Sequence, residues 1–524
     1  MFDLKIAGAL LYDGTGTPAR AADVGILGDR IADVGDLAAA PARESLDARG
    51  RCLCPGFIDV HTHSDTLALQ VPDAPSKLFQ GVTVEVAGNC GGSAAPAGEE
   101  RALTAGAGAN AVEYRWRTVA EYRACVERAR PAVNLALLVG HNTLRAAVMG
   151  YANRPAGADE TRRMAAALDQ ALEEGGWGFS TGLIYSPGRY SEREEIVALA
   201  RVAARRNRIY TTHVRNEAAG LLDAIEEALE IGARAGIRTQ ISHFKAAGRA
   251  NWPLMTPAME RVRRAIADGQ PVAADRYPYL ASQTVLKVML PSDEAAGTTA
   301  EILARLRDPV ARARIRARIL AERAPDYWPG ILVGFSRTEG GRHQGRRLTE
   351  VAAEWGLEPV DAAFRLLEED HLDTHGIFFS MSEEDQWRVL AEPYVMIGSD
   401  GSIRATRGPT SGGHPHPRAF GAFARFLRAA LDGRTVPVAE AIRKMTSLPA
   451  RTFGFRDRGE IRPGAYADLV VFDPAAARDR ATYEKPLQLA EGFTAVIVNG
   501  VLTLRDGRLT GARAGRFLAP EDAA

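Results

Sequence analysis

The apolar residues at both ends of the chain fall in short runs between turn signals. Near the start, DLKIAGALLYDG and DVGILGDRIADVGD cluster or alternate apolar positions between Asp-Gly and Gly-Asp dipeptides, without a helical stripe of useful length. Near the end, ADLVVFDP and TAVIVNGVLTLRDGRL follow the same pattern, with Asn-Gly and Asp-Gly at the turns. Two all-β segments around a different middle predict one small β-sandwich domain, formed by residues 1–54 and 455–524 together.

The middle of the chain alternates between two kinds of segment. Short runs rich in β-branched residues, such as GFIDVHTH, GVTVEVAG and YVMIGSD, are separated by stretches such as EREEIVALARVAARRN with apolar residues at three- and four-residue steps. This α/β alternation indicates a parallel sheet, and about eight repeats within about 400 residues favour a TIM-like (β/α)8 barrel over residues 55–454. Residues from about 282 to 346 do not follow the alternation and predict a subdomain inserted over the barrel mouth.

Composition and charge narrow the class of protein. The 524 residues include 65 basic and 65 acidic side chains, and this balance gives no electrostatic argument for a nucleic acid or an anionic membrane as partner. No apolar run approaches the ~20 residues of a membrane helix, and the first residues lack a cleavage-site pattern. Four cysteines are too few for a disulfide scaffold in a chain of this length. We therefore expect a cytoplasmic protein, a monomer or small homo-oligomer, without nucleic-acid or membrane partners.

Five of the predicted strands end in side chains that can bind a metal. In a barrel of this kind the catalytic side chains lie at the carboxyl ends of the strands. GFIDVHTH ends in two histidines, and their spacing of two residues places both rings on one face of the strand. Because five such ends occur in barrel order, the sequence predicts one shared metal site. The candidate ligands are His61, His63, Cys90, His213, His243 and Asp400.

Each candidate also has an ordinary structural interpretation. A lone histidine at a strand end is more often a structural residue, and Cys90 alone could be a small buried apolar residue. Asp400 stands in Ser-Asp-Gly, which is favourable turn chemistry. The same apolar interpretation is preferred for the remaining cysteines, although the spacing of the first two alone would allow a metal site. These cysteines are Cys52, Cys54 and Cys125.

Longer motifs resemble a known family. PGFIDVHTHSD, the late GSDG, PGAYADLVVFD and VIVNG together resemble the amidohydrolase superfamily. GNCGGS, THVRNE, ISHFKAAG, YPY and HPHPR resemble its D-aminoacylase branch, the N-acyl-D-amino-acid deacylases. The resemblance extends over essentially the whole chain, and it implies a TIM-like barrel with a β-sandwich built from both termini.

The few lysines distinguish between members of this superfamily. Many binuclear members bridge two metals with a carboxylated lysine on a middle strand, but no lysine occurs between Lys77 and Lys245. Cys90 is the expected substitute, as in the D-aminoacylase branch, and a thiolate with imidazoles favours zinc. By resemblance, a first group holds one tight Zn²⁺ and a second group borders a weaker position. The first group is Cys90, His213 and His243, and the second is His61, His63 and Asp400.

The resemblance also implies a reaction and a substrate. It implies zinc-dependent hydrolysis of the amide bond of N-acyl-D-amino acids, with metal-bound hydroxide attacking the carbonyl. Asp400 would act as general base and then as general acid. Lys245, Tyr277 and Arg418 match family positions that bind the substrate carboxylate, although a surface lysine, a core tyrosine and a solvated arginine are the alternative interpretations.

Two other functions stay open at this point. One is hydrolysis of a cyclic amide or imide, as in hydantoinase- or dihydroorotase-like relatives; the missing lysine is evidence against it. The other is a catalytically inactive binding scaffold, although all six candidate ligands are present. The roles of the remaining histidines are also open. His141, His414 and His416 could line the mouth or lie in loops, and His343, His371 and His375 have no supporting context.

Overall fold

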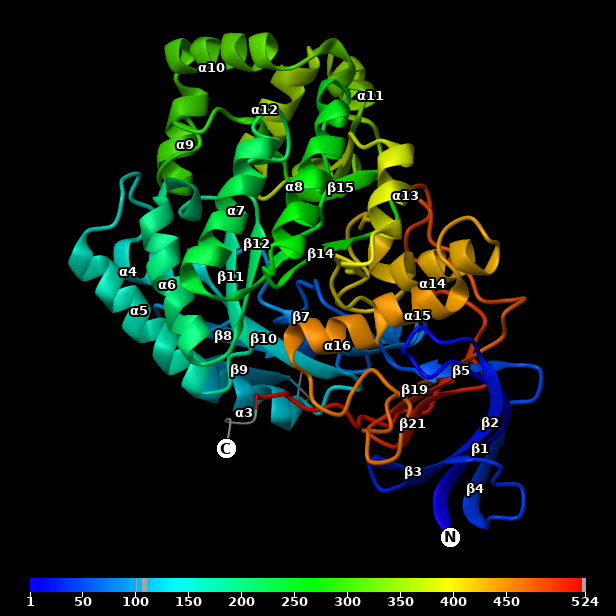
Figure 1. The fold of residues 1–524 in the computed structure, drawn as a ribbon. Coiled ribbons are helices and arrows are strands. Elements are labelled where there is room, and N and C mark those ends of the chain that lie inside the picture. Colours follow the sequence, from blue (N-terminus) through cyan, green and yellow to red (C-terminus); the bar gives the residue numbers. More distant parts are fainter. Residues whose placement is uncertain (100, 106–110, 521–524) are drawn as a thin grey trace.

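A barrel of eight parallel strands forms the centre of the molecule (Figure 1). The computed structural model describes residues 1–99, 101–105 and 111–520. The strands run in the order β18-β14-β13-β12-β11-β10-β7-β6, and a parallel bridge between Thr62 and Gly401 joins the two ends of this sheet. The predicted (β/α)8 barrel is confirmed. Its strands are β6 (Phe57–Asp59), β7 (Val82–Ala87), β10 (Asn134–Gly140), β11 (Gly178–Gly182), β12 (Ile209–His213), β13 (Arg238–Ile241), β14 (Val272–Arg276) and β18 (Val395–Ile397).

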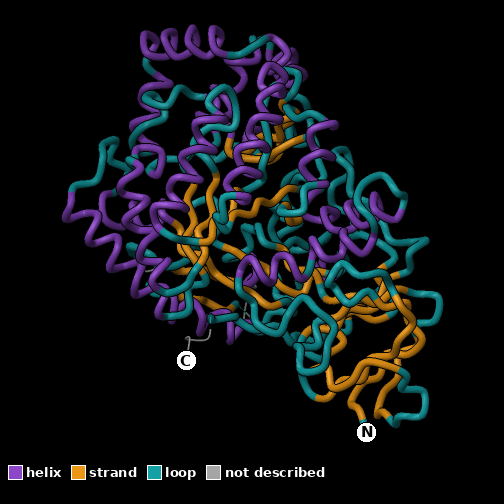
Figure 2. The backbone as a smooth tube through the Cα atoms, viewed as in Figure 1, coloured by secondary structure: helices purple, strands orange, loops and turns teal. Residues whose placement is uncertain are grey.

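Helices between the strands surround the barrel (Figure 2). α7 shows how the sequence specifies them: Leu221, Ile225 and Ala228 are buried along one face. The helix ends at Gly236, whose left-handed backbone (φ +65°) suits glycine. The principal outer helices are α3 (Val119–Ala129), α4 (His141–Met149), α5 (Ala158–Glu173), α6 (Arg193–Arg205), α7 (Leu221–Ala235), α8 (Met255–Ala267), α13 (Glu383–Ala391), α14 (Arg418–Leu431), α15 (Val438–Met445) and α16 (Ser447–Phe453).

Both ends of the chain join one sheet of nine strands beside the barrel (Figure 1). β5 connects them, because it pairs with β1 on one side and with β19 on the other. Leu53 and Val471 face a core within this domain, whereas Cys54 and Val470 face the core shared with the barrel. The strands are β1 (Phe2–Leu11), β2 (Arg20–Leu27), β3 (Arg30–Gly35), β4 (Ala42–Asp47), β5 (Cys52–Pro55), β19 (Leu469–Phe472), β20 (Phe493–Val498), β21 (Val501–Arg505) and β22 (Arg508–Leu509).

Before α13, the connection between β14 and β18 carries a separate small sheet and four α-helices. β17 lies between β15 and β16 and pairs antiparallel with both. The helices have their own apolar core, distinct from that of the barrel. Part of this unit lies beyond residue 346, where the sequence prediction ended the insertion. Its elements are β15 (Ala281–Val285), α9 (Thr299–Arg307), α10 (Pro309–Glu322), β16 (Ile331–Phe335), α11 (Leu348–Trp355), α12 (Pro359–Glu369) and β17 (His375–Phe379).

Four further elements lie in the connections after β6 and β7. α1 (Leu67–Gln70) and α2 (Pro75–Leu78) are short helices between these two strands. β8 (Arg101–Ala105) and β9 (Val112–Trp116) form an antiparallel hairpin after β7.

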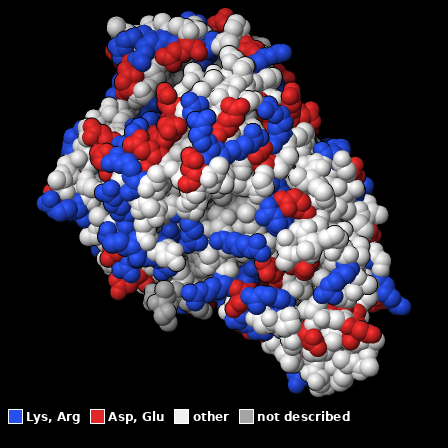
Figure 3. Space-filling view, viewed as in Figure 1, with Lys and Arg blue, Asp and Glu red and all other residues white. Residues whose placement is uncertain are grey.

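The surface carries both signs of charge. On the face drawn in Figure 3, basic and acidic side chains are interspersed over the helices of the barrel and of the insertion. In the described ranges, no helix combines the length and the apolar composition needed to cross a bilayer.

Candidate metal centre

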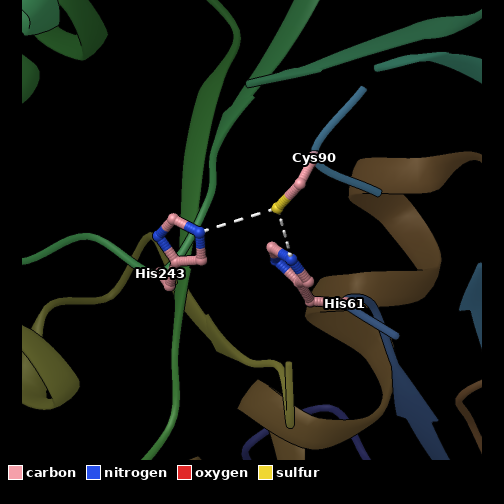
Figure 4. A group of neighbouring side chains, drawn as sticks. All are labelled: His61, Cys90 and His243. Carbon is pink, nitrogen blue, oxygen red and sulfur yellow. Dashed lines mark hydrogen bonds between the residues drawn. The ribbon is translucent and has the colours of Figure 1, made fainter. Parts of the chain in front are cut away.

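The six predicted ligands converge at the carboxyl ends of five barrel strands. Cys90 lies near the middle of the cluster: its Sγ is 3.2 Å from His61 Nε2 and 3.7 Å from His243 Nε2 (Figure 4). His243 Nε2 is in turn 2.9 Å from His213 Nδ1. The ligand atoms of His61, Cys90 and His243 all lie within 4.8 Å of one another, so one cation could contact all three.

A second group adjoins the first and shares one of its histidines. His63 Nε2 is 3.0 Å from Asp400 Oδ1, and His61 Nε2 is 3.7 Å from the same oxygen. These three residues form a second set that could hold a cation. His213, Glu217 and His243 form a third such set. Within the described residues, the centre therefore offers three overlapping sets of ligand atoms, in which His61 and His243 are each shared by two. Which residues hold which ion stays a prediction.

Three of the candidate ligands have an uncommon backbone conformation. Cys90, His243 and Asp400 have φ angles of +53°, +35° and +49°. Residues other than glycine are uncommon in this left-handed region, and each one destabilises the folded state by about 1–3 kcal/mol. Residues held in this way cluster at functional sites, where the rest of the fold maintains the geometry.

The electrostatics of Cys90 favour a thiolate. Burial would raise the pKa of the thiol, but charge on His61 and hydrogen bonds from His213 and His243 outweigh burial and hold this pKa well below its usual range. A thiolate among imidazoles is a donor set that suits zinc. His213 Nε2 is buried, lies 3.7 Å from Glu217 Oε1 and has no hydrogen-bond partner among the described residues, so its lone pair can bind a metal. The residues present therefore fit a zinc ion.

Two carboxylates outside the predicted set orient the histidines. Asp275, at 0% exposure, accepts a hydrogen bond from His61 Nδ1 at 3.2 Å and another from the backbone N of His243 at 3.0 Å. The Glu217 carboxylate lies 2.9 Å from His243 Nδ1. Carboxylates that bind the second nitrogen of a ligand histidine fix its ring and its tautomer.

Neither of these carboxylates was identified from the sequence. Glu217 lies four residues after His213 in THVRNE, so its position in that motif is the signal that could have found it. Asp275 is 214 residues from His61, and no local pattern joins them. Nothing in the sequence indicated Tyr185 either. The centre of its ring is 4.9 Å from the centre of the His213 ring, and its hydroxyl is 3.1 Å from Thr284 Oγ1.

The predicted carboxylate-binding residues lie beside the same centre. Arg418 Nη1 is 2.8 Å from Asp400 Oδ2, and the guanidinium lies 4.6 Å from the centre of the Tyr277 ring. Lys245 forms an ion pair with Glu217 and has its Nζ 2.9 Å from His243 Nδ1. β13 ends at Ile241, so a continued strand is not what places Lys245 beside His243. The Tyr277 hydroxyl is buried and has no hydrogen-bond partner in the described structure.

The histidines whose roles were open mostly support other groups. His141 is buried and contacts the Glu195 carboxylate at 2.7 Å, while His416 Nδ1 accepts a hydrogen bond from the backbone N of Arg418. His414 Nε2 contacts the Tyr483 carbonyl. His343 Nε2 contacts Glu339, while His371 and His375 lie at the end of α12 and the start of β17. Cys52, Cys54 and Cys125 are all buried.

Fold and site together define a TIM barrel with a metal-capable cluster at its strand ends. A family described as "Amidohydrolase family" matches residues 44–322 and 395–508. N-acyl-D-glutamate deacylase of Alcaligenes xylosoxydans xylosoxydans is 39% identical over 99% of this chain and 98% of that protein. The chain belongs to the amidohydrolase family.

Solved structures place the chain within that family. The structure of N-acyl-D-glutamate deacylase from Bordetella bronchiseptica, complexed with zinc and a phosphonate mimic of the tetrahedral intermediate, matches with a TM-score of 0.84 and 37% identity, covering 99% of this chain and 100% of that one. A D-aminoacylase whose binuclear metal centre is described by one-metal activation and second-metal attenuation matches with a TM-score of 0.83, 37% identity and coverage of 99% and 100%. D-hydantoinase matches at 0.56 with 17% identity, covering 99% and 98%, a likeness of fold alone.

Proposed function

We propose that this protein hydrolyses the amide bond of N-acyl-D-amino acids with zinc at the centre described above, giving a carboxylate and a D-amino acid. One contact carries the proposal. The Arg418 guanidinium forms an ion pair with the Asp400 carboxylate, so a positively charged side chain lies directly beside the metal-capable cluster. A substrate whose carbonyl lies at the cluster would thus present its carboxylate to a buried guanidinium. The relatives named above, at 37–39% identity over the whole chain, support this substrate class.

The metal arrangement within this proposal follows the predicted division. Cys90, His213 and His243 would hold one zinc firmly, and His61, His63 and Asp400 would border a second, weaker position. When bound, zinc makes water more acidic and polarises a carbonyl oxygen. Side chains of the protein carry out the other steps, which are proton transfer and binding of the substrate.

Asp400 is the proton carrier. Burial would raise the pKa of its carboxyl, but Arg418 and the hydrogen bond from His63 hold that pKa well below its usual range, so the group is ionised at neutral pH. The carboxylate accepts a proton from the water that attacks the amide carbon. It then returns this proton to the nitrogen of the departing amine, so the amino acid leaves as a neutral amine rather than as an anion.

Lys245, Tyr277 and Arg418 bind the carboxylate of the substrate. All three are buried, at 5%, 0% and 3% exposure, so a carboxylate that reaches them loses most of its water. Charge-assisted hydrogen bonds are roughly twice as strong as neutral ones and also fix orientation. The unpartnered Tyr277 hydroxyl supplies a further donor.

A comparison of a linear with a cyclic amide tests this function. The zinc-loaded protein is incubated with N-acetyl-D-methionine and, in parallel, with a 5-substituted hydantoin, and both mixtures are repeated after removal of the metal by a chelator. We expect metal-dependent release of D-methionine and no opening of the hydantoin. Opening of the hydantoin alone would support the cyclic-amide alternative. Zinc binding without turnover of either compound would indicate a binding scaffold.

A further inference from the structure

A cleft of about 670 Å³ lies beside the metal centre and has no part in the function proposed so far. Small or apolar residues make up most of its wall. Its charged residues are Glu99 and Arg101, and both are exposed, as are Ala102, Ala147 and Tyr151, so the cleft is open to solvent along this side. The wall comes from segments that follow β7, β10 and β11, and includes Gly92, Thr143, Ala146, Ala147, Tyr151 and Pro187.

Two residues of the cleft wall are close in sequence to residues of the metal centre. Gly92 is two residues beyond Cys90, so their Cα atoms are at most about 8 Å apart. Ser186, on another wall, directly follows Tyr185, whose ring packs on His213. The separation between Gly92 and Cys90 is short enough for a chain of several methylenes bound at the centre to reach the cleft.

The part of the cleft wall that follows β10 lies across the barrel from Tyr277, one of the carboxylate-binding residues. In the closed order of eight strands, β10 and β14 are four places apart, which makes them diametrically opposite. α4 follows β10 and supplies Ala146 to the cleft, whereas Tyr277 follows β14 and Arg418 begins α14. Figure 1 shows α4 and α14 on opposite sides of the barrel strands.

A linear N-acyl amino acid has the same two-ended layout. Its acyl chain and its carboxylate extend in opposite directions from the carbonyl that is attacked. If the carboxylate reaches Arg418 and the carbonyl lies at the metal centre, the acyl chain points toward α4. We infer that the cleft is the acyl-chain site and that the enzyme prefers apolar acyl groups longer than acetyl. This inference rests on the proposed function.

The size and the lining of the cleft support a longer chain. Ligand pockets of roughly 300–1,000 Å³ hold molecules of drug size, far larger than an acetyl group. The glycine, alanine and proline of the wall leave space and offer no charge to an acyl chain. Each methylene that such a wall buries raises kcat/KM by up to about fourfold.

The test varies the acyl chain and keeps the amino acid constant. N-acetyl-, N-butanoyl- and N-hexanoyl-D-methionine are compared with the zinc-loaded protein. We expect kcat/KM to be at least about tenfold higher for hexanoyl than for acetyl, since four methylenes are added. Turnover of acetyl with loss of activity at longer chains would overturn the acyl-chain site but leave the proposed function intact. Absence of turnover with every acyl group would overturn the proposed function itself.

Variants of the wall separate a bound chain from a general effect. Ala146→Phe fills the cleft with a side chain on a half-buried position of α4, and we expect it to remove the hexanoyl advantage while acetyl turnover stays within about twofold. Ala158→Phe makes the same change at an exposed position of α5 outside the cleft and should leave both rates unchanged. Tyr151→Ala, which opens the wall at a side chain that is 50% exposed, should lower the hexanoyl rate alone. Equal loss of both substrates in Ala146→Phe and Tyr151→Ala would overturn the inference.

Discussion

Cys90 supplies the only sulfur among the candidate ligands, and it carries the first prediction. Cys90→Ala removes a thiolate that contacts two imidazoles, so we expect most of the firmly held zinc to be lost, from close to one ion per chain. Cys125→Ala is the matched control, because Cys125 is buried in α3 and touches no candidate ligand. Elemental analysis of both purified variants measures the change. Full zinc content in Cys90→Ala would show that this cysteine is structural.

Asp400 carries the second prediction, which concerns rate rather than metal. Asp400→Asn keeps the size of the side chain but cannot accept the proton of the attacking water. We expect kcat to fall by 10²–10⁴-fold, the usual range for a positioned acid–base group, while firmly held zinc remains. Asp432→Asn, at the exposed end of α14, serves as the control. If a folded, zinc-loaded Asp400→Asn protein turned over at the rate of the unmodified protein, another residue would be the base.

At the residue scale, the sequence identified which side chains could bind a metal, but not how they are arranged. His61, Cys90 and Asp400 could be identified because each follows an apolar strand, a local pattern. The positive φ angles of Cys90 and Asp400 could not, because surrounding packing imposes them against the preference of the residue. Asp275 was missed for a related reason: it lies within the buried strand β14, and its partner His61 is distant in sequence.

Between elements, a buried ion cluster joins the first barrel strands to the last one. Lys77, on α2, has its Nζ 2.8 Å from Asp59 Oδ2 and 3.0 Å from Glu85 Oε1, and it donates a hydrogen bond to Ser399 Oγ at 3.0 Å. All four residues have 0% exposure. Ser399 directly precedes Asp400, so this cluster connects β6 and β7 to the segment that carries Asp400.

Removal of Lys77 should therefore destabilise the barrel. Lys77→Met leaves two buried carboxylates without their cation, which costs about 3–5 kcal/mol. Lys485→Met, at an exposed position, should change stability by no more than about 0.5 kcal/mol. Thermal unfolding of the two variants beside the unmodified protein measures the difference. An unchanged transition temperature in Lys77→Met would mean that the cluster contributes nothing to barrel closure.

Elements were predictable where their pattern is local. The period of α7 and the apolar runs of the strands specify the barrel, since each repeat has its own start and stop signals. The insertion was harder to delimit, because β15 and β17 are paired although about 90 residues separate them. The pairing with β15 determines where β17 lies, and the separate apolar core of the insertion holds α11 and α12. Local sequence alone does not show either.

At the scale of the whole molecule, the barrel carries two further units, the terminal sheet and the insertion. The terminal sheet packs on the barrel through the faces of β5 and β19, and the insertion contributes Gln283, whose carbonyl accepts a hydrogen bond from Arg418. The joining of both termini was predictable because each end carries the same strand-and-turn pattern. The contact of the insertion with Arg418 was not, because residues distant in sequence form it.

Hydrolysis of N-acyl-D-amino acids by this protein can be tested by comparing the rates for two enantiomers. The zinc-loaded protein is given N-acetyl-D- and N-acetyl-L-methionine at equal concentration, and release of the free amino acid is followed for each. We expect release of the D-amino acid, with the L-isomer hydrolysed far more slowly, and loss of both rates when the metal is removed. Equal or faster hydrolysis of the L-isomer, or a rate that does not depend on the metal, would contradict the proposed function.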